Sequence, residues 1–206
     1  ADVAVKDGKI AAVGKLSGEA AETVDAAGLT LAPGFIDVHG HSDFFMPLDP
    51  ARASKLLQGV TTELCGQCGL GPAPVTEQNY PVYHKYLSQQ GIPMYPDDRT
   101  FTSFSAYLSR MEQPPAGINL AYFIPHGTVR LAVMGFSHDA PDDRQLAQMR
   151  ELVEDAMQAG ALGLSTGLAY APGRFAATDE RAALTEPVGR YGGVYTSHLR
   201  DQGDQL

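Results

Sequence analysis

The sequence predicts an α/β protein in which strands and helices alternate and the sheet is parallel. From Leu31 onward, short apolar runs that end at glycine or polar residues repeat, with helical patterns between them. The clearest helical pattern, residues 141–159, brings Leu146, Met149 and Val153 near one face and has acidic residues in its first turn. Periodicity does not separate an open doubly wound sheet from a closed barrel.

Residues 1–31 follow a different pattern and are predicted to form a separate small β unit. Apolar and polar residues alternate around Val3 and Val5, the chain turns at Asp7-Gly8, and a second strand follows over residues 9–13. An Asp-Gly pair can supply the two positive φ values of a type I′ turn, so this segment is predicted to be a hairpin.

The remaining elements follow in chain order. The sequence predicts strands at residues 31–38, 60–66, 118–125, 161–167 and 193–198, and helices at residues 49–58, 104–112 and 141–159. The excursion over residues 72–100 is long for a connection, which indicates a functional loop or a short helix of its own around residues 80–90.

Composition narrows the class of function. The chain has 206 residues and a formal net charge of −9, which argues against nucleic acid or an anionic membrane as a partner and favours a small-molecule substrate. No apolar run approaches the ~18 residues of a membrane span, and no basic-then-apolar leader is present, so we expect a cytoplasmic protein. The chain starts at Ala1 without Met, which leaves room for a targeting segment upstream; oligomeric state stays open.

His39-Gly40-His41 is the most informative motif. Side chains at i and i+2 of a strand point to the same face, so the end of the first apolar run aims both imidazoles into one cavity. Two neutral imidazoles suit a divalent metal such as zinc. Cys65 and Cys68 have the CxxC spacing of a zinc-ribbon half, but a ribbon needs a second pair and the chain has none.

Four segments together resemble the amidohydrolase superfamily, and within it the N-acyl-D-amino-acid deacylase branch. They are residues 33–43 (PGFIDVHGHSD), 59–69 (GVTTELCGQCG), 160–170 (GALGLSTGLAY) and 195–201 (YTSHLRD). The resemblance implies a (β/α)8 TIM-type barrel with a metal centre at the strand C-termini, and residues 1–31 as part of an accompanying β-sandwich. A whole barrel has ~250 residues and about 175 follow the hairpin, so residues 32–206 are expected to be its first five βα units, without the C-terminal ones.

The resemblance also implies the site residues. His39, His41, Cys68 and His198 are the expected ligands of one or two zinc ions, with Cys68 in the place that other amidohydrolases give to a carboxylated lysine or a glutamate. The branch usually has Asn before this cysteine, where this chain has Gln67. Cys65, in the apolar strand, is expected to be core. A further His and an Asp general base, expected after strands six and eight, cannot be placed in this chain.

Three further residues are candidates for substrate binding. Tyr170 matches a position that contacts the substrate carboxylate in the family, although packing at the barrel rim explains a loop tyrosine equally well. Ser165 is expected to line the pocket, and His126 is expected to face the substrate or support the metal ligands. His84 and His138 lie in polar surroundings and are expected at the surface.

The resemblance implies metal-dependent hydrolysis of N-acyl-D-amino acids, in which the metal activates water and polarises the amide carbonyl. A cyclic-amide hydrolase of the dihydroorotase or hydantoinase type is an alternative, but those enzymes use a modified lysine on strand four and residues 161–167 contain none. A non-catalytic scaffold with the same fold is the other alternative. Fold by itself does not fix the acyl group or the amino acid.

Overall fold

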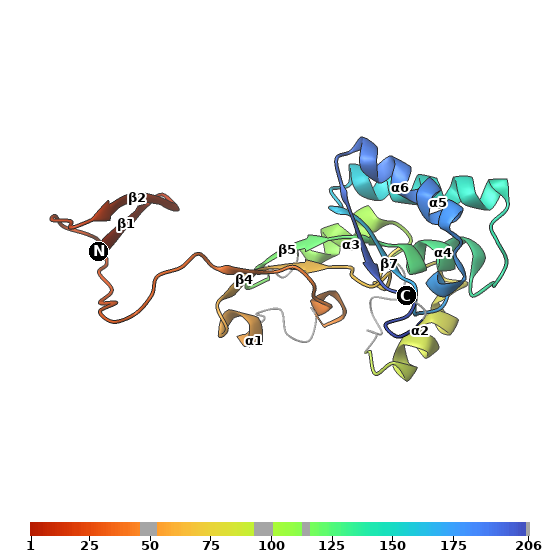
Figure 1. The fold of residues 1–206 in the computed structure, drawn as a ribbon, viewed down its shortest axis with the longest axis horizontal. Coiled ribbons are helices and arrows are strands. Elements are labelled where there is room, and N and C mark those ends of the chain that lie inside the picture. Colours follow the sequence, from red (N-terminus) through yellow and green to blue (C-terminus); the bar gives the residue numbers. More distant parts are fainter. Residues whose placement is uncertain (46–52, 93–100, 113–115, 205–206) are drawn as a thin grey trace. The chain divides into compact units, whose positions relative to one another are not determined.

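A computed structural model of the chain describes residues 1–45, 53–92, 101–112 and 116–204 (Figure 1). The chain divides into two compact units, Ala1–Pro33 and Gly34–Leu206, which are described separately. No helix in these ranges is long and apolar enough to cross a membrane.

The first unit contains the predicted hairpin. Strands β1 (Asp2–Lys6) and β2 (Lys9–Gly14) pair in antiparallel fashion. Asp7 and Gly8 have φ values of 50° and 71°, as the type I′ turn requires. The side-chain carboxylate of Asp2 accepts a hydrogen bond from the backbone N–H of Leu16 (3.0 Å), which fixes the chain as it leaves the hairpin.

The second unit contains two three-stranded parallel sheets, in the orders β3-β4-β5 and β6-β7-β8. The strands are β3 (Phe35–Asp37), β4 (Val60–Cys65), β5 (Asn119–Tyr122), β6 (Ile124–Pro125), β7 (Gly163–Gly167) and β8 (Val194–His198). The predicted parallel pairing is therefore confirmed.

The predicted third strand, residues 118–125, is interrupted at Phe123 and forms β5 and β6. The backbone N–H of Phe123 donates to the Cys65 carbonyl (2.9 Å), while the N–H of Leu162 donates to the Tyr122 carbonyl (2.8 Å). Here the chain stops pairing with β4 and starts pairing with β7. The prediction of one continuous strand was wrong because the two halves have different neighbours.

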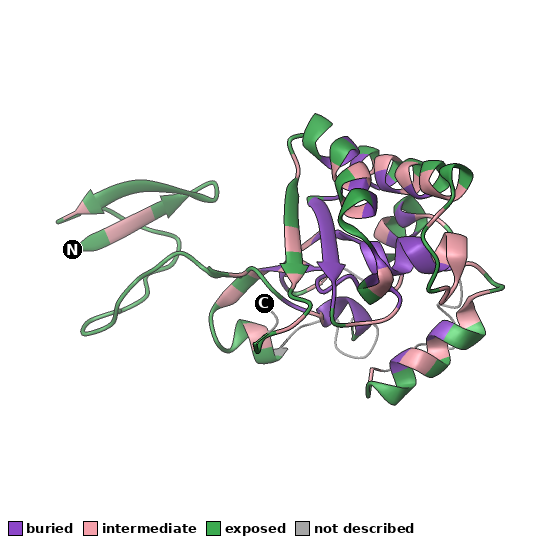
Figure 2. Ribbon diagram, turned by 45° about the vertical axis from the view of Figure 1, so that its right-hand side comes forward, coloured by how far each residue is buried: buried purple, intermediate pink, exposed green. Residues whose placement is uncertain are grey.

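Among the described strands, β3 is an edge of the first sheet and β8 is an edge of the second. In Figure 2, β7 is buried along its length, whereas β8 is largely exposed. The prediction of a long buried first strand was wrong: β3 has three residues, and Phe35 and Ile36 are about 60% exposed (60% and 61%). The reason is that β3 pairs with β4 on one side only among the described strands.

Helices α2, α3 and α5 confirm predictions, and α1 agrees with the described part of another. The helices are α1 (Ala53–Leu56), α2 (Tyr80–Gln89), α3 (Phe104–Met111), α4 (His126–Met134), α5 (Asp143–Gln158) and α6 (Thr178–Arg190), with 3-10 turns η1 (Ser42–Phe44) and η2 (Gly173–Phe175). The predicted start of α1, residues 49–52, lies outside the described residues. Helices α4 and α6 were not predicted, because α4 follows β6 without a loop and α6 contains Pro187, a residue that usually ends a helix.

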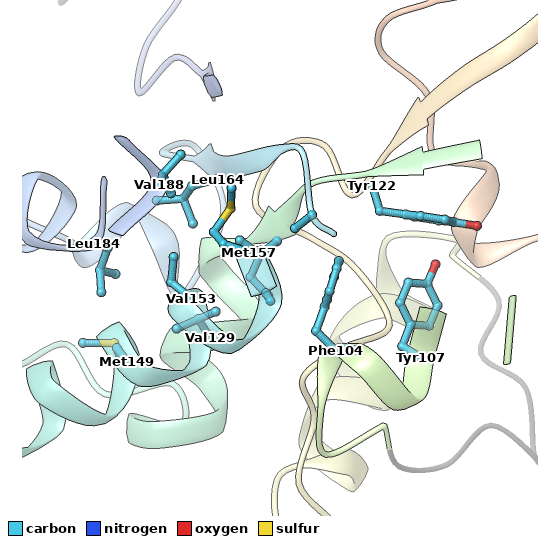
Figure 3. Close-up of a cluster of buried hydrophobic side chains, with 14 of the residues drawn as sticks. Phe104, Tyr107, Tyr122, Val129, Met149, Val153, Met157, Leu164, Leu184 and Val188 are labelled. Atoms are coloured by element: carbon cyan, nitrogen blue, oxygen red, sulfur yellow. The ribbon is translucent and has the colours of Figure 1, made fainter. Parts of the chain in front are cut away.

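The main core lies between helices α3 to α6 and the strands that they cover (Figure 3). Helix α5 supplies the predicted apolar face, since Met149 and Val153 are fully buried. A capping box between Asp142 and Gln145 fixes the first turn of this helix. A smaller cluster joins α2 to the loop after β4 through Tyr83, Leu87 and Leu70. The two clusters hold the C-terminal ends of the strands in place.

Candidate metal centre

The expected ligands occupy the C-terminal ends of parallel strands. His39 and His41 follow β3, Cys68 follows β4, and His198 is the last residue of β8. The carboxyl ends of parallel strands meet at one edge of a sheet, where ligand sites commonly form. Residues more than a hundred positions apart in the sequence therefore come together.

Their donor atoms are close to one another. The ligand atoms of His39, His41 and Cys68 all lie within 4.8 Å of one another. Cys68 Sγ is 3.2 Å from His39 Nε2 and 3.6 Å from His198 Nδ1. Bond lengths of ~2.0–2.3 Å in a tetrahedral zinc site separate neighbouring donors by roughly 3.3–3.7 Å. The two distances from Cys68 Sγ are close to this range, whereas the three-residue group as a whole extends to 4.8 Å.

The loop that carries Cys68 is held in an unusual backbone conformation. Cys68 has φ = 58°, a region that residues other than glycine adopt infrequently and that clusters at functional sites. The loop lies so close to the end of β7 that a Cβ on Gly167 would be 1.8 Å from the Cys68 carbonyl oxygen. A larger residue at position 167 would therefore collide with the backbone of the cysteine loop.

Three charged side chains, Asp37, Lys55 and Glu63, lie beside the His39-Gly40-His41 turn. Asp37 accepts a hydrogen bond from the His39 N–H (3.1 Å), and the fully buried Glu63 accepts one from the Ser42 N–H (3.2 Å). Lys55 forms an ion pair with Asp37 and lies 3.8 Å from Glu63 Oε1. A Cβ on Gly40 would collide with Glu63, so the turn can approach the carboxylate only with glycine there.

Asp43 connects the histidine turn to the cysteine loop. Its Oδ2 accepts a hydrogen bond from the Gly66 N–H (3.1 Å), and the side chain is almost fully buried. Burial, reinforced by the charge of Glu63, raises the pKa of Asp43 to about 7. Asp43 Oδ1 and Glu63 Oε2 have no hydrogen-bond partner among the described residues.

The surroundings of His41 favour its neutral imidazole. Burial and the neighbouring His39 lower the pKa of His41, which keeps a nitrogen lone pair available at neutral pH. Burial raises the pKa of the Cys68 thiol when no cation is present. A bound cation would reverse this, because thiols bind metals as thiolates. We therefore expect the Cys68 thiol to lose its proton when a metal binds.

Tyr170 lies beside the proposed ligands. Its ring packs against that of His198, with centroids 4.8 Å apart and an interplanar angle of 60°. Burial and the neighbouring Cys68 raise the pKa of the Tyr170 hydroxyl. Its position is compatible both with substrate contact and with packing at the rim, the two alternatives that the sequence leaves open.

Ser165 and His126 have no exposed surface, and the structure shows both in hydrogen bonds that fix other segments. The Ser165 hydroxyl accepts from the Gly69 N–H (3.1 Å) and donates to the Gly66 carbonyl, which anchors the cysteine loop. His126 Nε2 is 2.9 Å from Glu180 Oε1 at the buried contact between α4 and α6. Both side chains are therefore buried within the described structure, and their roles at the site stay predictions.

The other histidines are outside the cluster. His84 packs its ring against Tyr80 on α2, and His138 packs against Phe175. Cys65 is fully buried in β4, as expected for a core residue.

Sequence reasoning missed the supporting residues Asp37, Lys55 and Glu63. The sequence contained a signal for Glu63, which lies near the end of an apolar strand. A carboxylate in a buried strand needs a specific partner, because burying an unpaired charge is costly. Nothing in the pattern of residues 53–58 marks Lys55 as the counter-charge. Gln67 was noticed only as a departure from the usual Asn.

Comparison with known proteins places this geometry in a family. A model described as "Amidohydrolase family" matches residues 22–193. D-aminoacylase of Alcaligenes xylosoxydans xylosoxydans is 40% identical over all of this chain and 42% of its own length, and N-acyl-D-glutamate deacylase of the same organism is 35% identical over all of this chain and 41% of its own length.

A solved structure is also similar. The crystal structure of N-acyl-D-glutamate deacylase from Bordetella bronchiseptica, complexed with zinc and a phosphonate inhibitor, matches 98% of this chain and 41% of that protein, with 35% identity and a TM-score of 0.86. The chain spans about two fifths of the length of these relatives. From the family match over most of its length and the ligand types at its strand ends, the chain belongs to the amidohydrolase family.

Proposed function

We propose that the chain is the metal-binding part of a zinc-dependent hydrolase that cleaves the amide bond of N-acyl-D-amino acids on a (β/α)8 barrel. The observation that carries the proposal is the convergence of imidazole and thiol donors from separate strand ends, in a chain similar along its length to D-aminoacylase. The six parallel strands, β3 to β8, pair in chain order within each sheet, which is compatible with the first units of such a barrel.

In this proposal His39, His41, Cys68 and His198 hold the zinc. A cation there supplies Lewis-acid polarisation of the amide carbonyl and activation of water. The zinc and phosphonate inhibitor bound to the deacylase of B. bronchiseptica support this choice of ion. The ligand types agree, because zinc accepts both sulfur and nitrogen donors, whereas Mg²⁺ and Ca²⁺ prefer oxygen.

The protein residues around the metal orient it and the substrate. Asp37 and Glu63 accept hydrogen bonds from the backbone on either side of the two histidines, and Asp43 accepts one from the Gly66 N–H, which joins the histidine turn to the cysteine loop. In this proposal Tyr170 donates a hydrogen bond to the carboxylate of the bound amino acid; its packing against His198 beside the candidate ligands supports that role. Recognition of that carboxylate would distinguish an N-acyl amino acid from a simple amide.

The test is a hydrolysis screen of the full-length protein, loaded with Zn²⁺, against N-acetyl-D- and N-acetyl-L-amino acids and against cyclic amides such as dihydroorotate and hydantoin. We expect release of free D-amino acid and its loss on chelation. Turnover of cyclic amides alone would favour a dihydroorotase-type enzyme. Metal binding without turnover of any of these would favour the non-catalytic scaffold.

A further inference from the structure

Gln67, the residue before Cys68, has a buried side-chain amide whose nitrogen and oxygen both form hydrogen bonds. The side chain is 1% exposed. Its amide nitrogen donates to the backbone carbonyl of Val38 (3.0 Å), and its amide oxygen accepts from the hydroxyl of Thr196 (3.0 Å). A carbonyl can only accept a hydrogen bond, so the nitrogen must face Val38 and the oxygen is left for Thr196.

The two partners of Gln67 adjoin the other candidate ligands. Val38 immediately precedes His39, and Thr196 lies two residues before His198 on β8. Among the described strands β3 and β8 belong to different sheets and share no ladder. The Gln67 side chain therefore links the segment with the histidine pair, the loop with Cys68 and the strand with His198.

We propose that Gln67 is a positioning residue that sets the spacing between these three groups of metal ligands. It touches neither substrate nor, in this assignment, the metal. The proposal rests on the metal site proposed above and deepens it. Such a link matters here because β3 is a three-residue edge strand and because the strained φ of Cys68 persists only where surrounding contacts hold it.

The length of the side chain is part of this argument. Asparagine is shorter by one methylene, or about 1.5 Å of reach. From the same backbone position an Asn side chain cannot keep both 3.0 Å contacts, so one partner would lose its bond or the strands would move closer. A buried amide with both ends satisfied is held rigidly, whereas one with a single partner is not.

The test measures binding of Co²⁺, whose visible spectrum reports ligand geometry, to the full-length protein and to Gln67→Asn and Gln67→Glu. Gln67→Glu keeps the length of the side chain but replaces the amide N–H donor that faces the Val38 carbonyl with a carboxylate oxygen, which can only accept. Loss of an outer partner of a metal ligand typically weakens binding by about 10- to 100-fold, so we expect that rise in Kd and shifted thiolate-to-cobalt and d–d bands in both variants. Gln158→Glu, the same change at an exposed position on α5, should leave both unchanged.

Thr196→Val removes the other end of the link and serves as a milder variant if Gln67 variants fail to fold. It should shift the spectrum in the same direction, and its effect combined with Gln67→Asn should be smaller than the sum of the two. The proposal is overturned if folded variants at both positions bind Co²⁺ with the wild-type Kd and spectrum, even if they melt earlier. A wild type that binds no Co²⁺ would overturn the metal site itself, and with it this proposal.

Discussion

At the scale of single residues, Cys68 shows how the fold makes an ordinary side chain a candidate metal ligand. The thiol is buried, its backbone is strained, and its sulfur lies between imidazole nitrogens of His39 and His198. Cys65, three positions earlier, is also buried but lies within β4, where its side chain packs in the main core. The same residue type therefore has different roles on the two sides of a strand end.

Replacing the two cysteines separately tests this difference. Cys68→Ala should abolish stoichiometric zinc binding, because it removes the proposed thiolate, while Cys65→Ala should bind zinc as the wild type does. Metal content after dialysis, measured by atomic emission, gives the comparison. Affinity of the wild type should also fall toward acid pH, since the buried thiol must lose a proton to bind. Equal zinc content in wild type and Cys68→Ala would contradict the assignment.

Tyr170→Phe tests carboxylate recognition. The change removes a hydroxyl and leaves the ring against His198, so metal content should stay constant. A hydrogen bond to a charged group contributes about 1.5–3 kcal/mol, so kcat/KM for N-acyl-D-amino acids should fall roughly 10- to 100-fold in the full-length protein. Amides without a carboxylate are the control substrates. An unchanged rate, or an equal loss on both substrate types, would assign Tyr170 to rim packing.

At the scale of elements, helices α4 and α6 are joined by a buried charged cluster. Glu180 lies 2.9 Å from His126 Nε2 and pairs with Arg130, whose guanidinium also donates to the carbonyl of Asp139 (2.6 Å). Burial by itself would raise the pKa of Glu180, but the hydrogen bond from His126 and the charge of Arg130 hold it below the ordinary value. These contacts join helix α4 to helix α6.

Glu180→Gln should therefore destabilise the protein strongly. The fully buried Arg130 would lose its counter-charge, a situation that costs about 3–5 kcal/mol, and urea unfolding at pH 7 measures it. Glu154→Gln, which removes the surface pair with Arg190, is the matched control and should cost at most about 1 kcal/mol.

The effect of Glu180 should depend on pH in a defined direction. Because its pKa is lower in the folded state, its contribution is present above the unfolded value of 4.5 and is lost as pH falls through the folded pKa. The difference in free energy of unfolding between wild type and Glu180→Gln should shrink below pH 4.5. A difference that grows toward acid pH would show that Glu180 is not held ionised by His126 and Arg130.

At the scale of the whole molecule, the described edge strands β3 and β8 carry exposed apolar side chains. Phe35 and Ile36 on β3, and Val194 and Tyr195 on β8, are between 41% and 61% exposed. Unpaired strand edges with apolar side chains are templates for association with other chains. We expect the 206-residue chain by itself to self-associate with rising concentration.

Charged substitutions on the edges should suppress that association. Val194→Lys and Phe35→Lys place a cation on an edge strand, which blocks edge-to-edge pairing, and sedimentation velocity would show a shift toward monomer. Tyr191→Lys, at an exposed apolar residue outside any strand, is the control. Monomeric wild type at high concentration, or an equal effect of all three variants, would show that the edges do not drive association.

Much of the local structure follows from sequence because local patterns set it. The Asp7-Gly8 turn, the amphipathic face of α5 and the strand that ends near Cys65 all depend on residues within a few positions of one another. The pair His39 and His41 could be recognised from strand geometry, whereas Cys68 and His198 were expected from the resemblance to the amidohydrolase superfamily.

Only the tertiary structure decided how these parts meet. It interrupted the third strand at Phe123, because the chain changes neighbours there, and it formed α6 through Pro187, because packing against α5 outweighs the propensity of one residue. It also brought Asp37, Lys55 and Glu63 under the histidine turn and joined Val38 to Thr196 through Gln67. Contacts between residues up to 130 positions apart leave no periodic pattern in the sequence. The sequence therefore determined the types of the candidate ligands, and the fold determined the distances between them.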